Sequence, residues 1–211
     1  ATTAATATTS STTTTAMDSV RVPDDCKTLE EAVKRVHEDG CLTTIVLGEG
    51  EHQIDGNESY LEINSAMNIV GDPELPKEKI VVVGGITFKK GIQGNCHLQH
   101  LTLRRAEIHG VLGHSSFSMT DVLVEQCDFN GVVAMGTGVV GRCTNVEVRH
   151  CGESGMVAST DASFTLIGTK TTVHHNCTDG NSNAYGLKTY GSSATIQLVS
   201  PLSKEQVSIN N

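Results

Sequence analysis

Charged and polar residues recur at the ends of short apolar segments, and these are the first positions in this sequence that could do chemistry. One column reads Arg104, Glu125, Arg149 and His174, and the adjacent column reads Arg105, Gln126, His150 and His175. If the segments stack, each column brings its side chains close together. Histidine can act as an acid or a base near neutral pH. The catalytic candidates are therefore Arg149, His150, His174 and His175.

A self-neutralising surface is the competing interpretation of the same columns. The alternation of Arg104, Glu125 and Arg149 is what an exposed ladder of paired charges shows, and such a ladder needs no substrate. We favour this interpretation over a catalytic groove. Arg104, Arg105 and Glu125 remain candidates for binding a partner.

The sequence offers no recognisable metal or cofactor site. His174 and His175 are adjacent, so in a strand their side chains point to opposite faces and cannot easily share one ion. The aspartates are scattered over expected turns, where this residue is common, and no paired-carboxylate motif occurs. Phosphate-binding glycine loops, a Ser-His-Asp order and a dinucleotide fingerprint are missing from the sequence. We expect neither a metal nor a cofactor.

Tyrosines could supply a platform for a sugar ring. Aromatic residues make up only 3% of the chain, and Tyr185 and Tyr190 flank Gly186 beside the long inserted loop Thr178–Ala184. Loops carried on a rigid scaffold commonly hold binding residues, although a merely longer corner is the simpler explanation of this one. We take Tyr185 and Tyr190 as binding candidates.

A repeat must position all of these residues. The segments Leu101–Leu103, Val122–Val124 and Val146–Val148 are equivalent, with offsets of 21 and 24 residues, and Thr171–Val173 follows less clearly. A glycine comes after each segment, in a column formed by Gly110, Gly131, Gly155 and Gly186. Coils of this length cannot bury their own inward side chains, but a stack of them can. We predict a β-solenoid and disfavour an antiparallel sandwich, which would show hairpin turns instead.

The cysteines fit an interior column of the same repeat. Of the seven cysteines, Cys127 and Cys151 lie three residues after their strands, and Cys177 fills the slot in the next coil if one residue is inserted. Free buried thiols behave as small hydrophobes, which weakly favours a reducing intracellular compartment. Two glycosylation triplets, at Asn57 and Asn176, point the other way but are common by chance.

The N-terminal part differs from the repeat. Residues 1–20 are a low-complexity Ala/Thr/Ser tail or linker, and residues 21–211 are predicted to form a single domain. A capping box at Thr28 and Glu31, with a stop at Gly40, predicts an amphipathic helix over Leu29–Asp39. Short strands follow at Thr44–Leu47, Glu51–Ile54, Tyr60–Ile63, Met67–Val70, Ile80–Val83 and Ile86–Phe88.

Composition excludes two classes of partner. The formal net charge is −9, and no basic stripe is present, which argues against a nucleic-acid partner. No apolar run approaches the roughly 20 residues that a membrane span requires.

The chain resembles the pectin-lyase-like superfamily of right-handed parallel β-helices. The resemblance rests on the opening segment Thr28–Ile54, on Asn68–Gly85 and on the coil motif Thr144–Val157. It implies an all-β solenoid with a short N-terminal capping helix. Members include polysaccharide lyases and hydrolases, but the arginine or lysine base with calcium-binding carboxylates, and the clustered aspartates, are not recognisable in this sequence.

We therefore expect a non-catalytic scaffold or binding domain that is a structural component of a larger assembly. The segment Val207–Ile209 looks like a last strand with no capping helix after it, so a protein partner or another copy of the chain would cover that end. A glycan is a further candidate ligand. The alternative is a polysaccharide-active enzyme acting as a lyase, hydrolase or epimerase.

Overall fold

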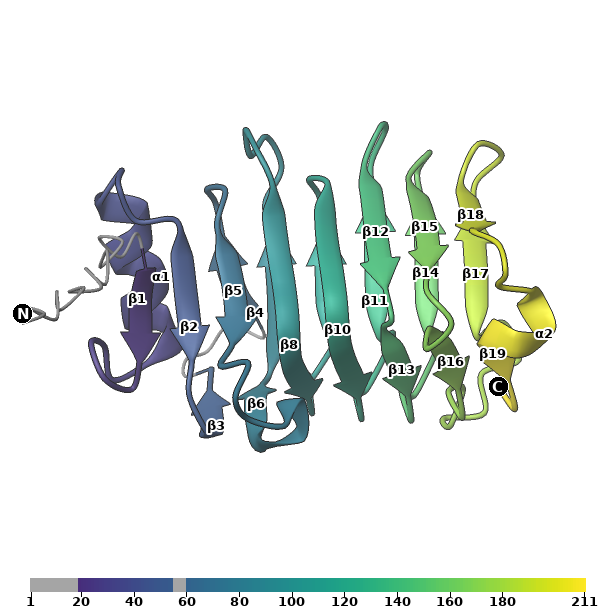
Figure 1. The fold of residues 1–211 in the computed structure, drawn as a ribbon. Coiled ribbons are helices and arrows are strands. Elements are labelled where there is room, and N and C mark those ends of the chain that lie inside the picture. The colour runs from purple at the N-terminus through teal and green to yellow at the C-terminus, as the bar shows by residue number, and fades with distance from the viewer. Residues whose placement is uncertain (1–18, 55–59) are drawn as a thin grey trace, which may run out of the picture.

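The computed structural model describes residues 19–54 and 60–211, and these residues form a stack of parallel coils (Figure 1). Strands of successive coils pair in parallel throughout the stack. The predicted parallel β-helix is therefore confirmed. An antiparallel sandwich would instead have joined neighbouring strands by hairpins. The coils agree with the pectin-lyase-like architecture that the sequence resembles.

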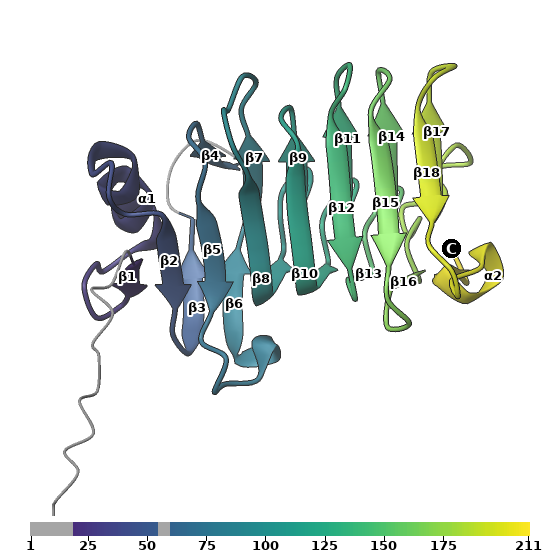
Figure 2. The same ribbon diagram turned by 45° about the horizontal axis from the view of Figure 1, so that its top comes forward.

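The strands of the stack form three sides, which we call face 1, face 2 and sheet B (Figure 2). Face 1 consists of β1 (Ser19–Val22), β2 (Thr44–Leu47), β5 (Asn68–Gly71), the first halves of β8 (Cys96–Arg104) and β10 (Phe117–Glu125), β12 (Val140–Thr144), β15 (Ser163–Ile167) and β18 (Thr195–Leu198). Face 2 consists of β3 (Gly50–Gln53), β6 (Ile80–Val83), the second halves of β8 and β10, β13 (Glu147–Arg149), β16 (Thr172–His174) and β19 (Ser208–Ile209). Sheet B consists of β4 (Tyr60–Ile63), β7 (Gly85–Phe88), β9 (Val111–Gly113), β11 (Val132–Met135), β14 (Met156–Ser159) and β17 (Leu187–Tyr190).

Single residues with a left-handed backbone turn the chain at the corners. His100, Asp121 and Asn145 have φ near +53° and separate face 1 from face 2 in successive coils. A second stack at the end of face 2 consists of Arg105, Gln126, His150 and His175, with φ between 53° and 57°. Left-handed backbone is unusual for residues other than glycine, so the recurrence of these values in register marks a built feature of the coil.

The glycine column has a packing reason. A Cβ atom on Gly131 would overlap the side chain of Val148 and the carbonyl oxygen of Gly155, and Gly110 and Gly155 face equivalent obstacles. These glycines stand where the chain enters sheet B, and only the absence of a side chain lets neighbouring coils approach so closely.

Inward side chains form one continuous core. The register aligns Leu98 with Met119 and Met119 with Cys143, as the repeat predicted, and all three are fully buried. Cys127 and Cys151 occupy equivalent interior positions, and all seven cysteines are free.

The prediction for Cys177 is wrong by one residue. Arg149 pairs with His174, so the residue that succeeds Cys151 in the next coil is Asn176. Its side-chain oxygen accepts the Cys151 N–H at 3.1 Å, and its amide donates to the Val148 carbonyl at 3.2 Å. Asn211 repeats both bonds one coil later, on Asn176 and Val173. Asn176 is therefore buried and hydrogen-bonded, and not presented as a glycosylation site.

A helix lies at the N-terminal end of the stack. α1 (Leu29–Glu38) begins at Thr28, whose hydroxyl accepts the Glu31 N–H as predicted. Leu29, Ala32, Val33 and Val36 are buried and belong to the core cluster with β1 and β2. Residues 1–18 lie outside the described residues, so most of the predicted tail is untested, although β1 already begins at Ser19.

The C-terminal coil contains a helical turn that the sequence did not suggest. α2 (Lys204–Val207) precedes β19 and buries Val207, which was predicted to be the first residue of that strand. The strand itself is present over Ser208–Ile209 and pairs with β16. Figure 1 places α2 at the far end of the stack from α1.

A strap crosses part of face 2. It runs from Asp72 to Lys79 and includes η1 (Lys77–Lys79). Lys77 Nζ contacts Asp121 Oδ1 at 2.7 Å, and His100 lies between the strap and face 2, with Nε2 at 2.7 Å from the Leu75 carbonyl. Beneath it, the outward side chains of Val81, Thr102 and Leu123 are buried.

Candidate functional site

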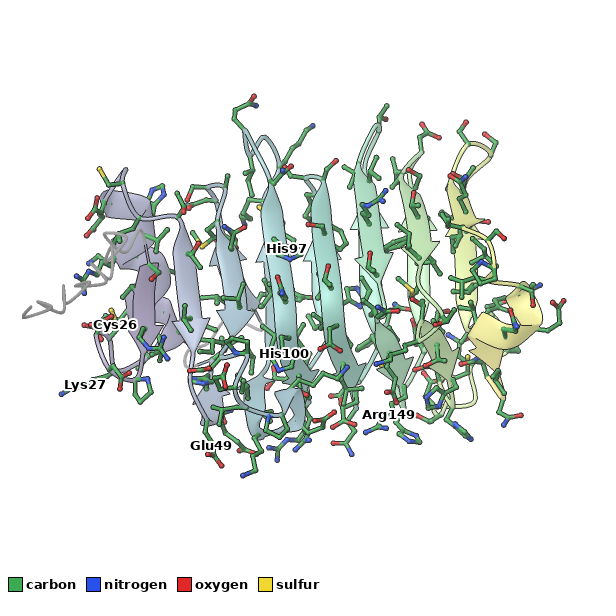
Figure 3. The ribbon with its side chains drawn as sticks, in the orientation of Figure 1. Cys26, Lys27, Glu49, His97, His100 and Arg149 are labelled. Atoms are coloured by element: carbon green, nitrogen blue, oxygen red, sulfur yellow. The ribbon has the colours of Figure 1, made fainter. Side chains whose placement is uncertain are left out.

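The predicted charged column on face 2 is a ladder of ion pairs. Arg104 Nε donates a hydrogen bond to one carboxylate oxygen of Glu125 at 2.6 Å, and Arg149 Nε donates to the other at 2.9 Å. Arg149 also reaches Glu147 at 2.8 Å, and His174 Nε2 lies 3.2 Å from the same oxygen. Arg149 lies at the lower edge of the coils in Figure 3. The charges of these side chains are thus paired with one another.

Burial and pairing act in opposite directions on this ladder. Burial alone would raise the pKa of Glu125, whose side chain is only 6% exposed, but the hydrogen bonds from Arg149 and Arg104 outweigh it and hold the pKa below its usual value. For Arg149, burial would lower the pKa, and the bond to Glu125 and the charge of Glu147 raise it. Arg149 therefore stays protonated and is not available as a base.

The three histidine candidates do lie together. Ring centroids of His150, His174 and His175 are 5.0 to 6.4 Å apart, and Nδ1 of His174 lies 2.8 Å from Nδ1 of His175. The expectation that His174 and His175 point to opposite faces is wrong, because the left-handed backbone at His175 interrupts strand alternation. Among the described residues, no three His, Cys, Asp or Glu side chains are arranged to hold a metal ion.

The remaining predicted binding residues are distributed over the surface. Arg105 contacts Glu51 at 3.1 Å in an exposed pair. Tyr185 is 54% exposed, and its backbone N–H donates to the Ser154 hydroxyl. Tyr190 is 69% exposed and lines a groove on sheet B.

This shallow groove, of about 200 Å³, lies on sheet B and is a candidate site for a ligand chain. Its floor consists of outward side chains of β11 and β14, with Val133 beside Val157 and Lys188 next in register. Met135, Ser159 and Tyr190 form a second row. His109, Asn130 and Glu153 form the polar wall at the strand starts.

A ladder of side-chain acceptors connects that wall to the coils of β4, β9, β11, β14 and β17, with Tyr60 reaching past the coil of β7. Each side chain accepts the backbone N–H of the next member: Tyr60 Oη from His109, His109 Nδ1 from Asn130, Asn130 Oδ1 from Ser154, and Ser154 Oγ from Tyr185. The four distances lie between 3.0 and 3.3 Å. The wall is therefore fixed before any ligand arrives, which reduces the entropy lost on binding.

The ladder also sets the tautomer of His109. Because Nδ1 accepts a backbone N–H, the proton of the neutral imidazole sits on Nε2. Burial lowers the pKa of His109, and only the nearby charge of Glu153 opposes this. His109 is thus a neutral hydrogen-bond donor on its Nε2 side.

Glu153 is the acidic residue that lines the groove. Asn130 Nδ2 donates to one of its oxygens at 3.2 Å, and Asn181 Nδ2 donates to the other at 3.0 Å. Asn181 belongs to the inserted loop Thr178–Ala184, so this loop contacts the polar wall of the groove. Its role is to orient the Glu153 carboxylate.

His109, Asn130 and Glu153 were missed as site residues, although a signal for the wall was present. His109, Asn130, Ser154 and Tyr185 each stand one position before a glycine of the repeat column. That shared position places them on one edge of sheet B. The sequence alone did not reveal that their side chains bond the next coil.

Comparisons with known proteins give fold-level similarity only. No family model matches the chain, and no curated protein does either. Among solved structures, three catalytic domains of GH87 α-1,3-glucanase, each in complex with nigerose, align with 85% of this chain. The identities are 13%, 14% and 15%, and the TM-scores are 0.42, 0.38 and 0.36. The chain spans less than half the length of these domains, 38% to 44%.

No helix among the described residues is long and apolar enough to cross a membrane.

Proposed function

We propose that this chain is a polysaccharide-binding β-helix without catalytic activity of its own, and that the groove on sheet B is its binding site. One observation carries the proposal: Tyr190 stands 69% exposed beside a groove whose polar wall is already hydrogen-bonded. An exposed aromatic ring next to fixed donors and acceptors suits a sugar, which has apolar faces and hydroxyl edges.

The direction of the groove suits an extended chain. The lining runs along β11 and β14, from Asn130 and Glu153 at the strand starts to Met135 and Ser159 at the strand ends. A linear glycan lying along these strands would meet the polar wall first and Tyr190 last.

Polysaccharide cleavage is the second candidate function, and Glu153 is the observation that favours it. The carboxylate lies in the groove and acts on the charge state of His109. Most glycoside hydrolases use two carboxylates, and no other acidic residue lines this groove. His109 offers Nε2–H, a donor, where a general base would need a free lone pair. These features favour binding over turnover.

Binding and turnover can be separated in one experiment. Affinity electrophoresis or calorimetry against a panel of neutral glucans, including α-1,3-glucan, and polyuronates should find at least one ligand. Tyr190→Ala should weaken the affinity for that ligand about five- to tenfold, because the variant loses roughly 1 kcal/mol of contact with the aromatic ring. Tyr185→Ala is the matched control, since Tyr185 is exposed but does not line the groove.

The outcome also decides between the two functions. Release of new reducing ends or unsaturated products that stops in Glu153→Gln would establish the enzyme and overturn the proposal. Equal weakening of glycan binding by Tyr185→Ala and Tyr190→Ala would show that the groove is not the binding site.

The ends of the solenoid belong to the same proposal. α1 would cap the N-terminal end of a right-handed helix, the sense that parallel crossovers adopt almost without exception. At the other end, β17, β18 and β19 pair on one side only within the described residues. A protein partner or a second copy would cover those edges, and a monomer by light scattering at high concentration would contradict this.

A further inference from the structure

A second cavity adjoins the groove at the ends of the sheet B strands. It has a volume of about 350 Å³ and is lined by Lys90, His114, Met135, Gly136, Thr137, Val139 and Thr160. The lining comes from the turns that follow β7, β9, β11 and β14. Met135 lines both cavities, and Ser159 of the groove is bonded to Thr160 of the second cavity.

The charge of this cavity is opposite to that of the protein. Lys90 and His114 are its ionisable residues, and none of its lining residues is acidic, in a chain of net charge −9. Asp161 follows Thr160 in sequence but does not line the cavity. The cavity is therefore a local cationic position on an acidic molecule.

Lys90 differs from its neighbour Lys89 in being unpaired. Lys89 forms an ion pair with Glu62, whereas the Lys90 ammonium has no ion pair or hydrogen bond among the described residues. A cation that lines a cavity without a counter-charge is the arrangement that an anionic ligand would complete.

Uncharged donors surround the same cavity. Thr137 and Thr160 contribute hydroxyl groups, and Thr137 lies in a turn between Gly136 and Gly138, whose φ values are 123° and 76°. In this turn the Val139 N–H donates to the Gly136 carbonyl, while the amides of Thr137 and Gly138 donate to no acceptor among the described residues. Together these groups form a set of donors suited to an oxyanion.

We propose that this cavity binds the oxyanion of an acidic substituent, a sulfate ester or a carboxylate, on the same chain that occupies the groove. This rests on the proposed function for its link to a glycan. It makes the preferred ligand an acidic polysaccharide, with the ring of one unit on Tyr190 and the acidic group of another between Lys90 and His114.

The test compares dextran with dextran sulfate, and inorganic sulfate with chloride at equal ionic strength. The chain should bind the sulfated polymer at least tenfold more tightly than the neutral one, and sulfate should raise its melting temperature. Lys90→Met should remove both differences. Lys89→Met is the matched control, because it removes the same charge one residue away.

Two results would overturn the anion site: equal affinity for the two polymers, or equal losses in Lys90→Met and Lys89→Met, which would indicate a diffuse charge effect. Tyr190→Ala separates this inference from the proposed function. If Lys90→Met abolishes sulfate stabilisation while Tyr190→Ala changes no polymer affinity, the anion site stands and the groove fails.

Discussion

Face 2 and sheet B are built from the same coils, yet their outer surfaces have opposite characters. On face 2, Arg104, Glu125, Arg149 and Glu147 are stacked closely enough to neutralise one another. On sheet B, Val133 and Val157 share a column with Lys188, and Glu153 stands in the polar wall at the strand starts, so no opposite charges share a column of the groove floor. Where opposite charges share a column, as on face 2, stacking lets them neutralise one another. Where no opposite charges share a column, as on sheet B, the surface keeps an open groove.

Disrupting the face 2 ladder should have the largest effect on stability. Glu125→Gln removes the buried carboxylate that pairs with both Arg104 and Arg149, and we expect a loss of about 2–3 kcal/mol in the free energy of unfolding, discounted because the arginines are partly exposed. Urea denaturation measures it. The control Glu51→Gln breaks the exposed pair with Arg105 and should cost less than about 0.5 kcal/mol. Similar losses for both variants would contradict the account of face 2.

Adding a side chain to a glycine at the entry to sheet B should lower the free energy of unfolding by about 2 kcal/mol. In Gly131→Ala the new methyl group would overlap Val148 and the Gly155 carbonyl, so neighbouring coils must separate. Gly40→Ala adds a methyl with nothing within 4 Å and is the control. Thermal unfolding of the two variants makes the comparison, and a Gly131→Ala variant as stable as the control would show that the glycine column is not required.

Two histidines should give stability opposite slopes with pH. Burial would lower the pKa of His100, but its bonds to the Leu75 carbonyl and Asp121 raise it, so its contribution is full below the unfolded value of about 6.5 and is lost as pH rises through the folded pKa. Burial lowers the pKa of His109, so its contribution is present above about 6.5 and is lost as pH falls through the folded pKa.

The measurement is the free energy of unfolding between pH 5 and 8, a range chosen around the ordinary histidine pKa of about 6.5. His100→Gln should remove stability mainly at the acidic end, and His109→Gln should lessen the loss of stability on acidification. The same sign of change in both variants would contradict the assignment of one charged and one neutral imidazole. Figure 3 shows His100 on β8, apart from His97 on the same strand.

The repeat in the sequence predicted most of the fold but only part of the site. Identical columns such as Leu98, Met119 and Cys143 reveal the stacking directly, because apolar residues must align to share a core. The period cannot locate a one-residue shift, which is why the sequence predicts Cys177 at the core position that Asn176 occupies. Histidine is enriched among residues with a left-handed backbone, but the residue type alone does not predict that conformation at His175. The groove wall depends on bonds between coils, such as that from Asn130 to His109, which no spacing reveals.

The most direct test of the central claim compares the two faces in one binding measurement. Calorimetry with a polysaccharide bound by the unaltered chain should show a five- to tenfold loss in Tyr190→Ala, about 1–1.4 kcal/mol, and no change in His150→Ala on face 2. Unchanged binding in Tyr190→Ala together with a loss in His150→Ala would place the ligand on face 2 and contradict the account.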